Sequence, residues 1–116
     1  MGISTHILDI SLGKPANNVQ VKLWQFRDDN ASGGSWRLLG EDYTDVDGRC
    51  KTLLGENQLI ATQYKLAFTV GVYFYDIQVE SIYSTIEIAF TVADPTQHYH
   101  IPLLLTANGY TTYRGS

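Results

Sequence analysis

The sequence lacks several features that mark particular classes of protein. It has a single cysteine, Cys50, so no disulfide can form within the chain, which fits a reducing compartment. It has no basic run and a formal net charge of −4, which argues against a nucleic acid partner. No stretch approaches the roughly 20 apolar residues of a transmembrane helix, so no membrane association is expected. Residues 1–9 lack the basic and apolar regions of a secretory signal, which makes the cytoplasm the expected compartment.

The composition is that of a folded domain. Hydrophobic residues make up 44% of the chain and aromatic residues 12%, including eight tyrosines, which argues against disorder. A length of 116 residues suits one domain, and the sequence shows neither a linker nor an internal repeat. We therefore expect a single domain over residues 1–116.

Alternation of apolar and polar residues dominates the chain and predicts β-strands. The predicted strands are 4–10, 19–26, 36–44, 49–54, 64–70, 85–92, 98–105 and 110–114. Turn residues separate them, with a break at 13–15, a loop at 28–35, a tight turn at 45–48 and a loop at 55–61. Tyr73, Ile77 and Glu80 have helical spacing and predict a short helix over 73–81. The pattern is typical of an all-β fold, a two-sheet antiparallel sandwich with one short helix.

The segment from His98 to Leu105 carries the most information. Four alternate residues form a core face: Tyr99, Ile101, Leu103 and Leu105. The other face mixes imidazoles with apolar groups and suits a half-buried pocket: His98, His100, Pro102 and Leu104. Asn108-Gly109 follows, and because both residues tolerate positive φ, a hairpin is predicted there.

Three histidines are candidates for proton transfer, because their ordinary pKa of about 6.5 lies close to neutrality. His6 shares a strand face with Leu8 and Ile10, where simple packing at a sheet surface is the alternative. His98 and His100 lie on one face, roughly 7 Å apart along a strand. They could ligate zinc, but the spacing identifies no third ligand and Cys50 is a poor one, so no metal or cofactor is expected.

Arg49 and the last four residues are candidates for binding a substrate. Arg49 follows the Asp-Gly turn and is either a solvated charge or a fork of N–H donors for a planar anion. Arg114 has the same two interpretations, and alternation points it away from Tyr113. Tyr113 is either a packing aromatic or a platform for a flat heterocycle. Ser116 offers a hydroxyl that could orient an imidazole or a guanidinium.

HYHIPLLL at 98–105, followed by GYTTYRGS at 109–116, resembles the 5-hydroxyisourate hydrolases, the enzyme branch of the transthyretin-like proteins. Tyr113-Arg114-Gly115-Ser116 is similar to that branch's hallmark ending. The resemblance extends to His6 in STHILD, Arg49 in DVDGRC and His100 in HYH. In the transthyretins that carry hormones, the two histidines and the ending are replaced, so the resemblance favours the enzyme.

The resemblance implies a transthyretin-like sandwich and the hydrolysis of 5-hydroxyisourate to 2-oxo-4-hydroxy-4-carboxy-5-ureidoimidazoline in urate degradation. It implies that His6 and His100 share proton transfer, in an order left open, and that Arg49 binds the anionic ring. Tyr113, Arg114, Gly115 and Ser116 are implied to close and orient the pocket. It also implies a homotetramer built from two dimers, and the periplasm or the peroxisome as alternative compartments.

Two other functions are open from the residues alone. A non-catalytic carrier would bind a flat aromatic ligand in the same channel of a transthyretin-like tetramer. A generic β-sandwich interaction module would use its surface only, and it would leave the coincidence of His6, Arg49, His100 and the ending without a purpose.

Overall fold

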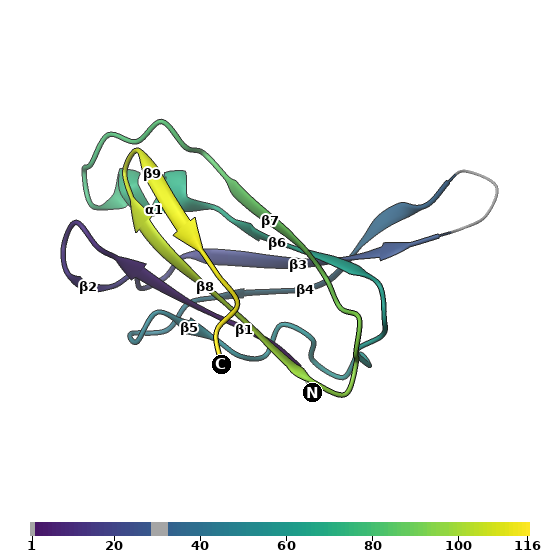
Figure 1. Ribbon diagram of the computed structural model, residues 1–116. Coiled ribbons are helices and arrows are strands. Elements are labelled where there is room, and N and C mark those ends of the chain that lie inside the picture. Colours follow the sequence, from purple (N-terminus) through teal and green to yellow (C-terminus); the bar gives the residue numbers. More distant parts are fainter. Residues whose placement is uncertain (1, 29–32) are drawn as a thin grey trace.

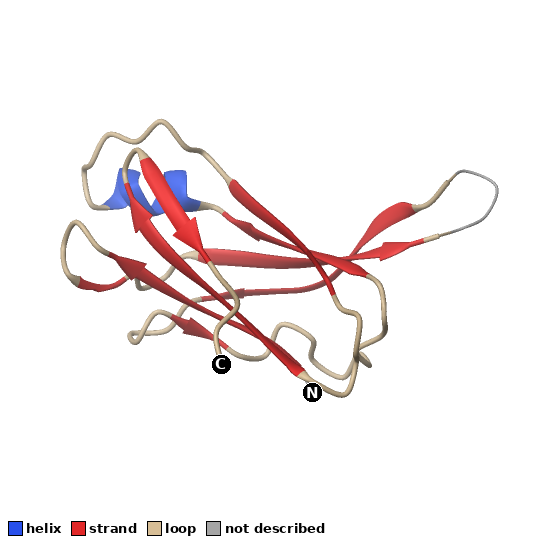
Figure 2. Ribbon diagram, in the orientation of Figure 1, coloured by secondary structure: helices blue, strands red, loops and turns tan. Residues whose placement is uncertain are grey.

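The computed structural model describes residues 2–28 and 33–116. The described elements, in chain order, are β1 (Gly2–Asp9), β2 (Lys14–Pro15), β3 (Gln20–Arg27), β4 (Ser35–Tyr43), β5 (Arg49–Cys50), β6 (Gln63–Phe68), α1 (Val70–Asp76), β7 (Ile86–Thr91), β8 (His98–Thr106) and β9 (Gly109–Thr112). The predicted all-β architecture with one short helix is confirmed (Figures 1 and 2).

The strands form two sheets. One has the order β2-β1-β8-β9, with β5 paired to β1, and the other has the order β4-β3-β6-β7. All pairs are antiparallel, as predicted, except that β1 and β8 run parallel over their whole length, from Gly2 opposite His98 to Asp9 opposite Leu105. The sequence interpretation missed this parallel pair because local alternation does not reveal strand direction. It brings an early strand and a late strand side by side (Figure 1).

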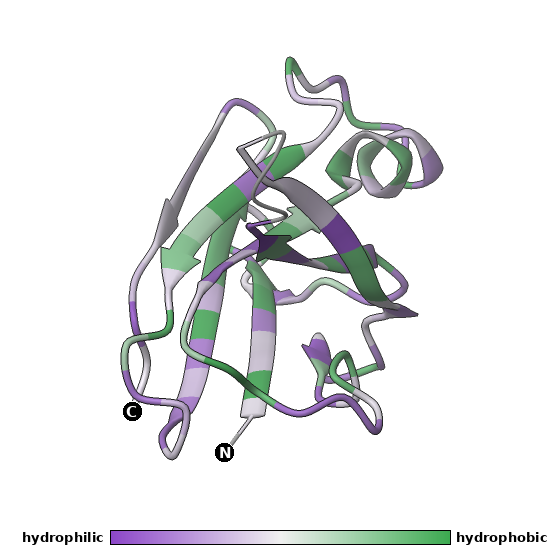
Figure 3. Ribbon diagram, turned by 90° about the vertical axis from the view of Figure 1, so that its right-hand side faces the viewer, coloured by the Kyte–Doolittle hydropathy of each residue, from purple (hydrophilic) through white to green (hydrophobic). Residues whose placement is uncertain are grey.

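The core lies between the two sheets, and strand alternation decides which side chains enter it (Figure 3). Ile3 and Ile7 of β1 are fully buried, as are Leu103 and Leu105 of β8. Each such side chain contributes about 1.5–3 kcal/mol through its burial. Because successive strand residues point to opposite faces, the residues between them are directed to the outer face of the sheet. The predicted candidate residues of β1 and β8 lie on that outer face.

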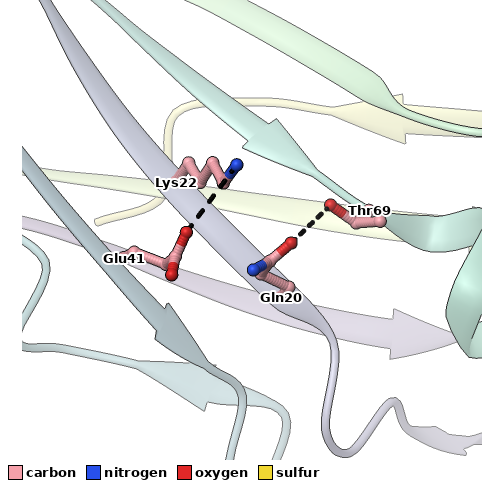
Figure 4. Close-up of polar contacts among 4 residues, drawn as sticks. All are labelled: Gln20, Lys22, Glu41 and Thr69. Carbon is pink, nitrogen blue, oxygen red and sulfur yellow. Dashed lines mark hydrogen bonds and ion pairs between the residues drawn. The ribbon is translucent and has the colours of Figure 1, made fainter. Parts of the chain in front are cut away.

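Polar contacts fix the register at one end of the other sheet (Figure 4). Lys22 Nζ of β3 lies 3.7 Å from Glu41 Oε2 of β4. The Thr69 hydroxyl, just beyond β6, donates a 3.1 Å hydrogen bond to Gln20 Oε1. The ion pair is solvent-exposed and is worth at most about 1 kcal/mol, so its role is pairing specificity more than stability.

The helix begins and ends earlier than predicted, at Val70 and Asp76 in place of 73 and 81. Val70, Tyr73 and Phe74 form its buried face. It ends because Gln78 takes φ +61°, while the amide of Val79 donates to the carbonyl of Phe74. This is a Schellman ending without the usual glycine, so no stop signal could be recognised from the residues there. No helix in the described part of the chain is long and apolar enough to cross a membrane.

Other elements also differ from the prediction. The strand predicted at 64–70 ends at Phe68, because Val70 begins the helix. The strand predicted at 49–54 ends at Cys50, because the chain turns and the Gly55 amide donates to the Thr52 carbonyl. The predicted break at 13–15 contains the short strand β2, which pairs with β1. The hairpin after β8 turns through residues 107 and 108, and neither they nor Gly109 have positive φ. The loop predicted at 28–35 falls partly on residues 29–32, which lie outside the described residues.

Candidate active site

The outer face of β5, β1 and β8 brings together residues that are far apart in the sequence. In the strand register, His6 lies opposite Arg49 on β5 and opposite Pro102 on β8. Ser4 lies opposite His100. Neighbouring strands are about 4.8 Å apart, so these side chains form one continuous patch.

A hollow of about 320 Å³ opens at this patch. It is lined by Ser4, Thr5, Arg49, Lys51, His98, His100 and Ser116. Of the residues singled out in the sequence, Arg49, His100 and Ser116 line the hollow directly. His6 lies beside it, next to Arg49 in the register.

His100 is the half-buried base of this group. Burial lowers its pKa below the ordinary value, and the neighbouring charges of Arg49, His6 and His98 lower the pKa further. A hydrogen bond with the backbone of Ser4 opposes this shift in part. Since burial and positive neighbours both disfavour the imidazolium, His100 is neutral at neutral pH and able to accept a proton.

The Asp-Gly turn holds Arg49 in place. The Asp45 carboxylate accepts hydrogen bonds from the backbone amides of Arg49 and Asp47, each at 2.9 Å. These bonds lower the pKa of Asp45, and the bond from Arg49 has the larger effect. Gly48 has φ +75°, and its carbonyl accepts the Ile7 amide at 2.8 Å. A Cβ on Gly48 would lie 2.4 Å from the Ile7 carbonyl oxygen, so only glycine permits this contact. The turn is therefore docked on β1, and Arg49 follows it directly.

The end of the chain is also tied to β8. The Gly115 amide donates a 2.8 Å hydrogen bond to the His100 carbonyl, forming an isolated bridge beyond β9. This contact places Ser116 at the hollow.

Tyr113 and Arg114 do not line the hollow in the single chain. The Arg114 guanidinium lies 4.4 Å from the Tyr99 ring centre and donates a 2.8 Å hydrogen bond to Gln97 Oε1. Tyr113 is 54% exposed. β9 ends at Thr112, so the strand alternation that predicted opposite directions for Tyr113 and Arg114 does not extend to them, and neither lines the hollow at His100.

Sequence reasoning missed Ser4 as a candidate. It named His98 as one of three histidines able to transfer a proton and as a possible zinc ligand, but left it out of the predicted site. Ser4 Oγ lies 2.8 Å from His98 Nε2 and 2.8 Å from His100 Nδ1. Alternation already placed Ser4 on the face of His6, but only the parallel pairing of β1 and β8 places Ser4 between the two imidazoles. Lys51, which also lines the hollow, carried no sequence signal beyond its charge.

Cys50 is directed to the core, not to the hollow. Burial, with the Asp42 and Asp45 carboxylates nearby, raises the pKa of its thiol to about 12. A protonated, buried thiol is a poor nucleophile, so thiol catalysis does not fit this site. Across residues 2–28 and 33–116, no cluster of three or more His, Cys, Asp or Glu side chains could hold a metal ion.

The patch therefore combines a neutral imidazole, a guanidinium whose backbone position is held by the Asp-Gly turn, two further imidazoles and hydroxyl groups around a hollow large enough for a small heterocycle. Residues 3–115 match the model of the HIUase/Transthyretin family. The chain belongs to this family.

Relatives within the HIUase/Transthyretin family are similar over nearly their whole length. A 5-hydroxyisourate hydrolase of Halalkalibacterium halodurans is 42% identical over 98% of this chain and 97% of its own. The 5-hydroxyisourate hydrolase of Mus musculus is 40% identical over 98% of this chain and 94% of its own.

Solved structures agree with this family assignment. The 5-hydroxyisourate hydrolase of Klebsiella pneumoniae is 33% identical, covers 100% of both chains and has a TM-score of 0.82. Sea bream transthyretin in complex with thyroxine is 28% identical, covers 99% of this chain and 95% of its own, and has a TM-score of 0.87. The fold is thus shared by an enzyme and a carrier, and the site has to distinguish them.

Proposed function

We propose that this protein hydrolyses 5-hydroxyisourate to 2-oxo-4-hydroxy-4-carboxy-5-ureidoimidazoline, a step in urate degradation. Relatives that carry this activity in their names are about 40% identical over nearly the full chain. The observation that carries the proposal is the neutral, half-buried His100 beside Arg49 in a hollow that Ser116 also lines. A passive carrier has no need of a base next to a cation.

In the proposed reaction, His100 acts as the general base and takes a proton from water. The resulting hydroxide forms a bond to a ring carbonyl carbon, and the carbon–nitrogen bond of that cyclic amide then breaks. Arg49 supports the negative charge on the carbonyl oxygen, and a protonated imidazole, His6 or His100, returns a proton to the leaving nitrogen. A positioned base contributes about 10²–10⁴-fold, and a fixed donor to the oxyanion about 10²–10³-fold.

We further propose that the active form is a homotetramer, a dimer of dimers. β9 and β7 are the last strands of the two sheets and both lie on the upper side in Figure 1. Such edges can pair with a second copy and extend both sheets. Ile10 and Leu12, after β1, are 52% and 51% exposed, and they offer apolar surface for a second contact.

In this assembly Tyr113, Arg114, Gly115 and Ser116 close and orient the pocket. Light scattering at micromolar concentration tests the assembly, and a monomer with full activity would contradict it. The proposed compartment is the cytoplasm, since a buried free Cys50 fits a reducing environment, with the periplasm and peroxisome as alternatives.

Stopped-flow absorbance with freshly generated 5-hydroxyisourate tests the activity directly. The unmutated protein should accelerate decay of the substrate, and His100→Asn should lose at least about 100-fold in kcat. Gln58→Asn, an exposed change outside the hollow, serves as the matched control and should leave the rate within twofold. If His100→Asn turned over substrate as fast as Gln58→Asn, the assignment of the base would be wrong.

The alternative function is a carrier of a flat aromatic ligand, favoured by the likeness to sea bream transthyretin bound to thyroxine. A carrier would show no catalysed decay of 5-hydroxyisourate. It would instead show a rise in Tm when an aromatic ligand such as thyroxine is added.

A further inference from the structure

The Ser4 hydroxyl bridges two imidazoles of β8. Its oxygen lies 2.8 Å from Nε2 of His98 and 2.8 Å from Nδ1 of His100. The parallel register explains this position. On the outer face of the pair, Gly2 lies opposite His98, Ser4 opposite His100 and His6 opposite Pro102. Ser4 is buried, so its hydroxyl has little access to water that could replace either partner.

The proton inventory of these three groups allows only two directions. A serine hydroxyl has one hydrogen, so it can donate to only one imidazole and must accept from the other. If His100 Nδ1–H donates to Ser4, then Ser4 donates to His98 Nε2, and Nε2 of His100 is left bare. That tautomer gives His100 a free lone pair for a water molecule in the hollow. The described residues provide no hydrogen-bond partner for that Nε2 atom.

We propose that Ser4 and His98 are positioning residues for His100: they select its Nδ1–H tautomer and form a relay that moves a proton between the two imidazoles. This inference rests on the proposed hydrolysis, and it adds two residues to the machinery that the sequence interpretation did not include.

The relay balances its protons in both directions. When His100 Nε2 takes a proton from water, its Nδ1 proton passes to Ser4 Oγ, and the Ser4 proton passes to His98 Nε2. The positive charge then lies on His98. On the return, His98 Nε2–H gives its proton to Ser4, and Ser4 restores Nδ1–H on His100. The Nε2 proton of His100 is then available for the leaving nitrogen. After that transfer, Ser4, His98 and His100 have returned to their starting protonation states.

The surroundings favour charge on His98 over charge on His100. His98 is exposed, so water can hydrate its imidazolium, whereas His100 is half-buried. Arg49 and His6 repel a charge on His100 from the β5 and β1 sides. Two cations lie near His98, because Lys51 lines the same hollow and Arg114 Nη2 contacts the His98 carbonyl. Hydration of the His98 imidazolium has to offset the repulsion from these two cations. The His98 ring lies close to Gly2, since a Cβ added there would meet Nδ1 at 3.3 Å.

Three variants test the relay. Ser4→Ala removes the hydroxyl, Ser4→Thr keeps it, and His98→Gln keeps a hydrogen-bond partner that cannot accept a proton. We expect Ser4→Ala and His98→Gln each to lose about tenfold in kcat, a part of the roughly 10²–10⁴-fold contribution of a general base, with KM within twofold. Ser4→Thr should recover most of kcat. Ser84→Ala, an exposed serine away from the hollow, is the matched control.

Two readouts separate a relay from a merely structural role. The double variant Ser4→Ala/His98→Gln should lose no more than either single variant, because each change already breaks the same chain. The acid limb of kcat/KM should also respond to His98, because His98→Gln removes a charge that lowers the pKa of His100 and so shifts the limb to higher pH. Ser84→Ala should leave the limb in place.

Imidazole 15N spectra of the unmutated protein test the tautomer without any substrate. The expected result is a protonated Nδ1 and a bare Nε2 on His100, changing to a mixture in Ser4→Ala. Additive losses in the double variant, or an Nε2–H tautomer on His100 in the unmutated protein, would overturn the relay. Absence of turnover by the unmutated protein would overturn the proposed function, while the 15N spectra would still decide whether Ser4 sets the tautomer.

Discussion

The backbone amide of Gly115 donates a 2.8 Å hydrogen bond to the carbonyl of His100, and a Cβ on Gly115 would lie 2.6 Å from His100 Cδ2. The φ of Gly115 is not positive, so conformational freedom does not explain this glycine. The reason is steric, because the backbone of Gly115 occupies the space beside the imidazole. The backbone of Gly115 therefore packs against one side of the His100 ring and restricts its position.

Gly115→Ala should displace the His100 ring and lower kcat by at least about tenfold, because small misplacements of a reacting group are costly. Gly109→Ala is the matched control, since its Cβ would meet only Thr106 Oγ1 at an ordinary 3.5 Å. Stopped-flow turnover and thermal unfolding of both variants provide the measurement. Equal kcat in the two variants would show that the contact between Gly115 and the His100 ring does not matter for catalysis.

The rate should stay high below the ordinary pKa of histidine. His100 must be neutral to accept a proton, and burial and nearby cations lower its pKa, so the acid limb of kcat/KM should fall below pH 6.5. Arg49→Gln removes one of these cations and should move the limb to higher pH, whereas Arg49→Lys keeps the charge and should not. Both variants should lose activity, because neither supplies a planar fork of donors. A limb at the same pH in Arg49→Gln and the unmutated protein would contradict the electrostatic coupling.

Stability should also depend on His100. Its pKa in the folded state is lower than in the unfolded chain, so the folded state binds fewer protons near pH 6. The corresponding stability is fully present above the unfolded pKa of about 6.5 and is lost as the pH falls through the folded pKa. Urea midpoints measured from pH 7.5 down to 5.5 should therefore decrease, and His100→Asn should flatten this decrease. A parallel decrease in both proteins would assign it to other groups.

Tyr73→Phe should destabilise the fold without touching the hollow. The Tyr73 hydroxyl donates a 2.7 Å hydrogen bond to the Asp9 carboxylate, which is 1% exposed, and burial and this bond raise the pKa of Tyr73. Losing a donor to a buried carboxylate costs about 1–3 kcal/mol. Tyr75→Phe, on a side chain that is 80% exposed, is the control and should change the free energy of unfolding little. Denaturant unfolding of both variants measures the difference.

Much of the fold could be predicted from the sequence, because alternation is a local signal. The core face of β8 was correct at every position: Tyr99, Ile101, Leu103 and Leu105 are buried. Features that depend on distant partners were not predictable. The hairpin after β8 formed without the positive φ expected of Asn108 and Gly109, and the helix ended through Gln78, a residue that gives no stop signal.

The site was predicted in part, for the same reason. Arg49, His100 and Ser116 meet at one hollow with His6 beside it, whereas Tyr113 and Arg114 lie elsewhere in the single chain. The roles of these residues stay predictions. Ser4 was missed, because its importance arises only from the parallel pairing with His100, and no periodicity within one strand carries that information.

The parallel pairing of β1 with β8 has a consequence for folding during synthesis. Ser4 and His100 are 96 residues apart in sequence, so a ribosome has to synthesise and release the whole segment between them before the two can meet. Contacts of such long range form slowly, on a scale of milliseconds to seconds. A nascent chain can assemble the β3–β4 hairpin early, but it has no working hollow. Catalytic activity should therefore appear only when β1 and β8 pair, in one late folding step.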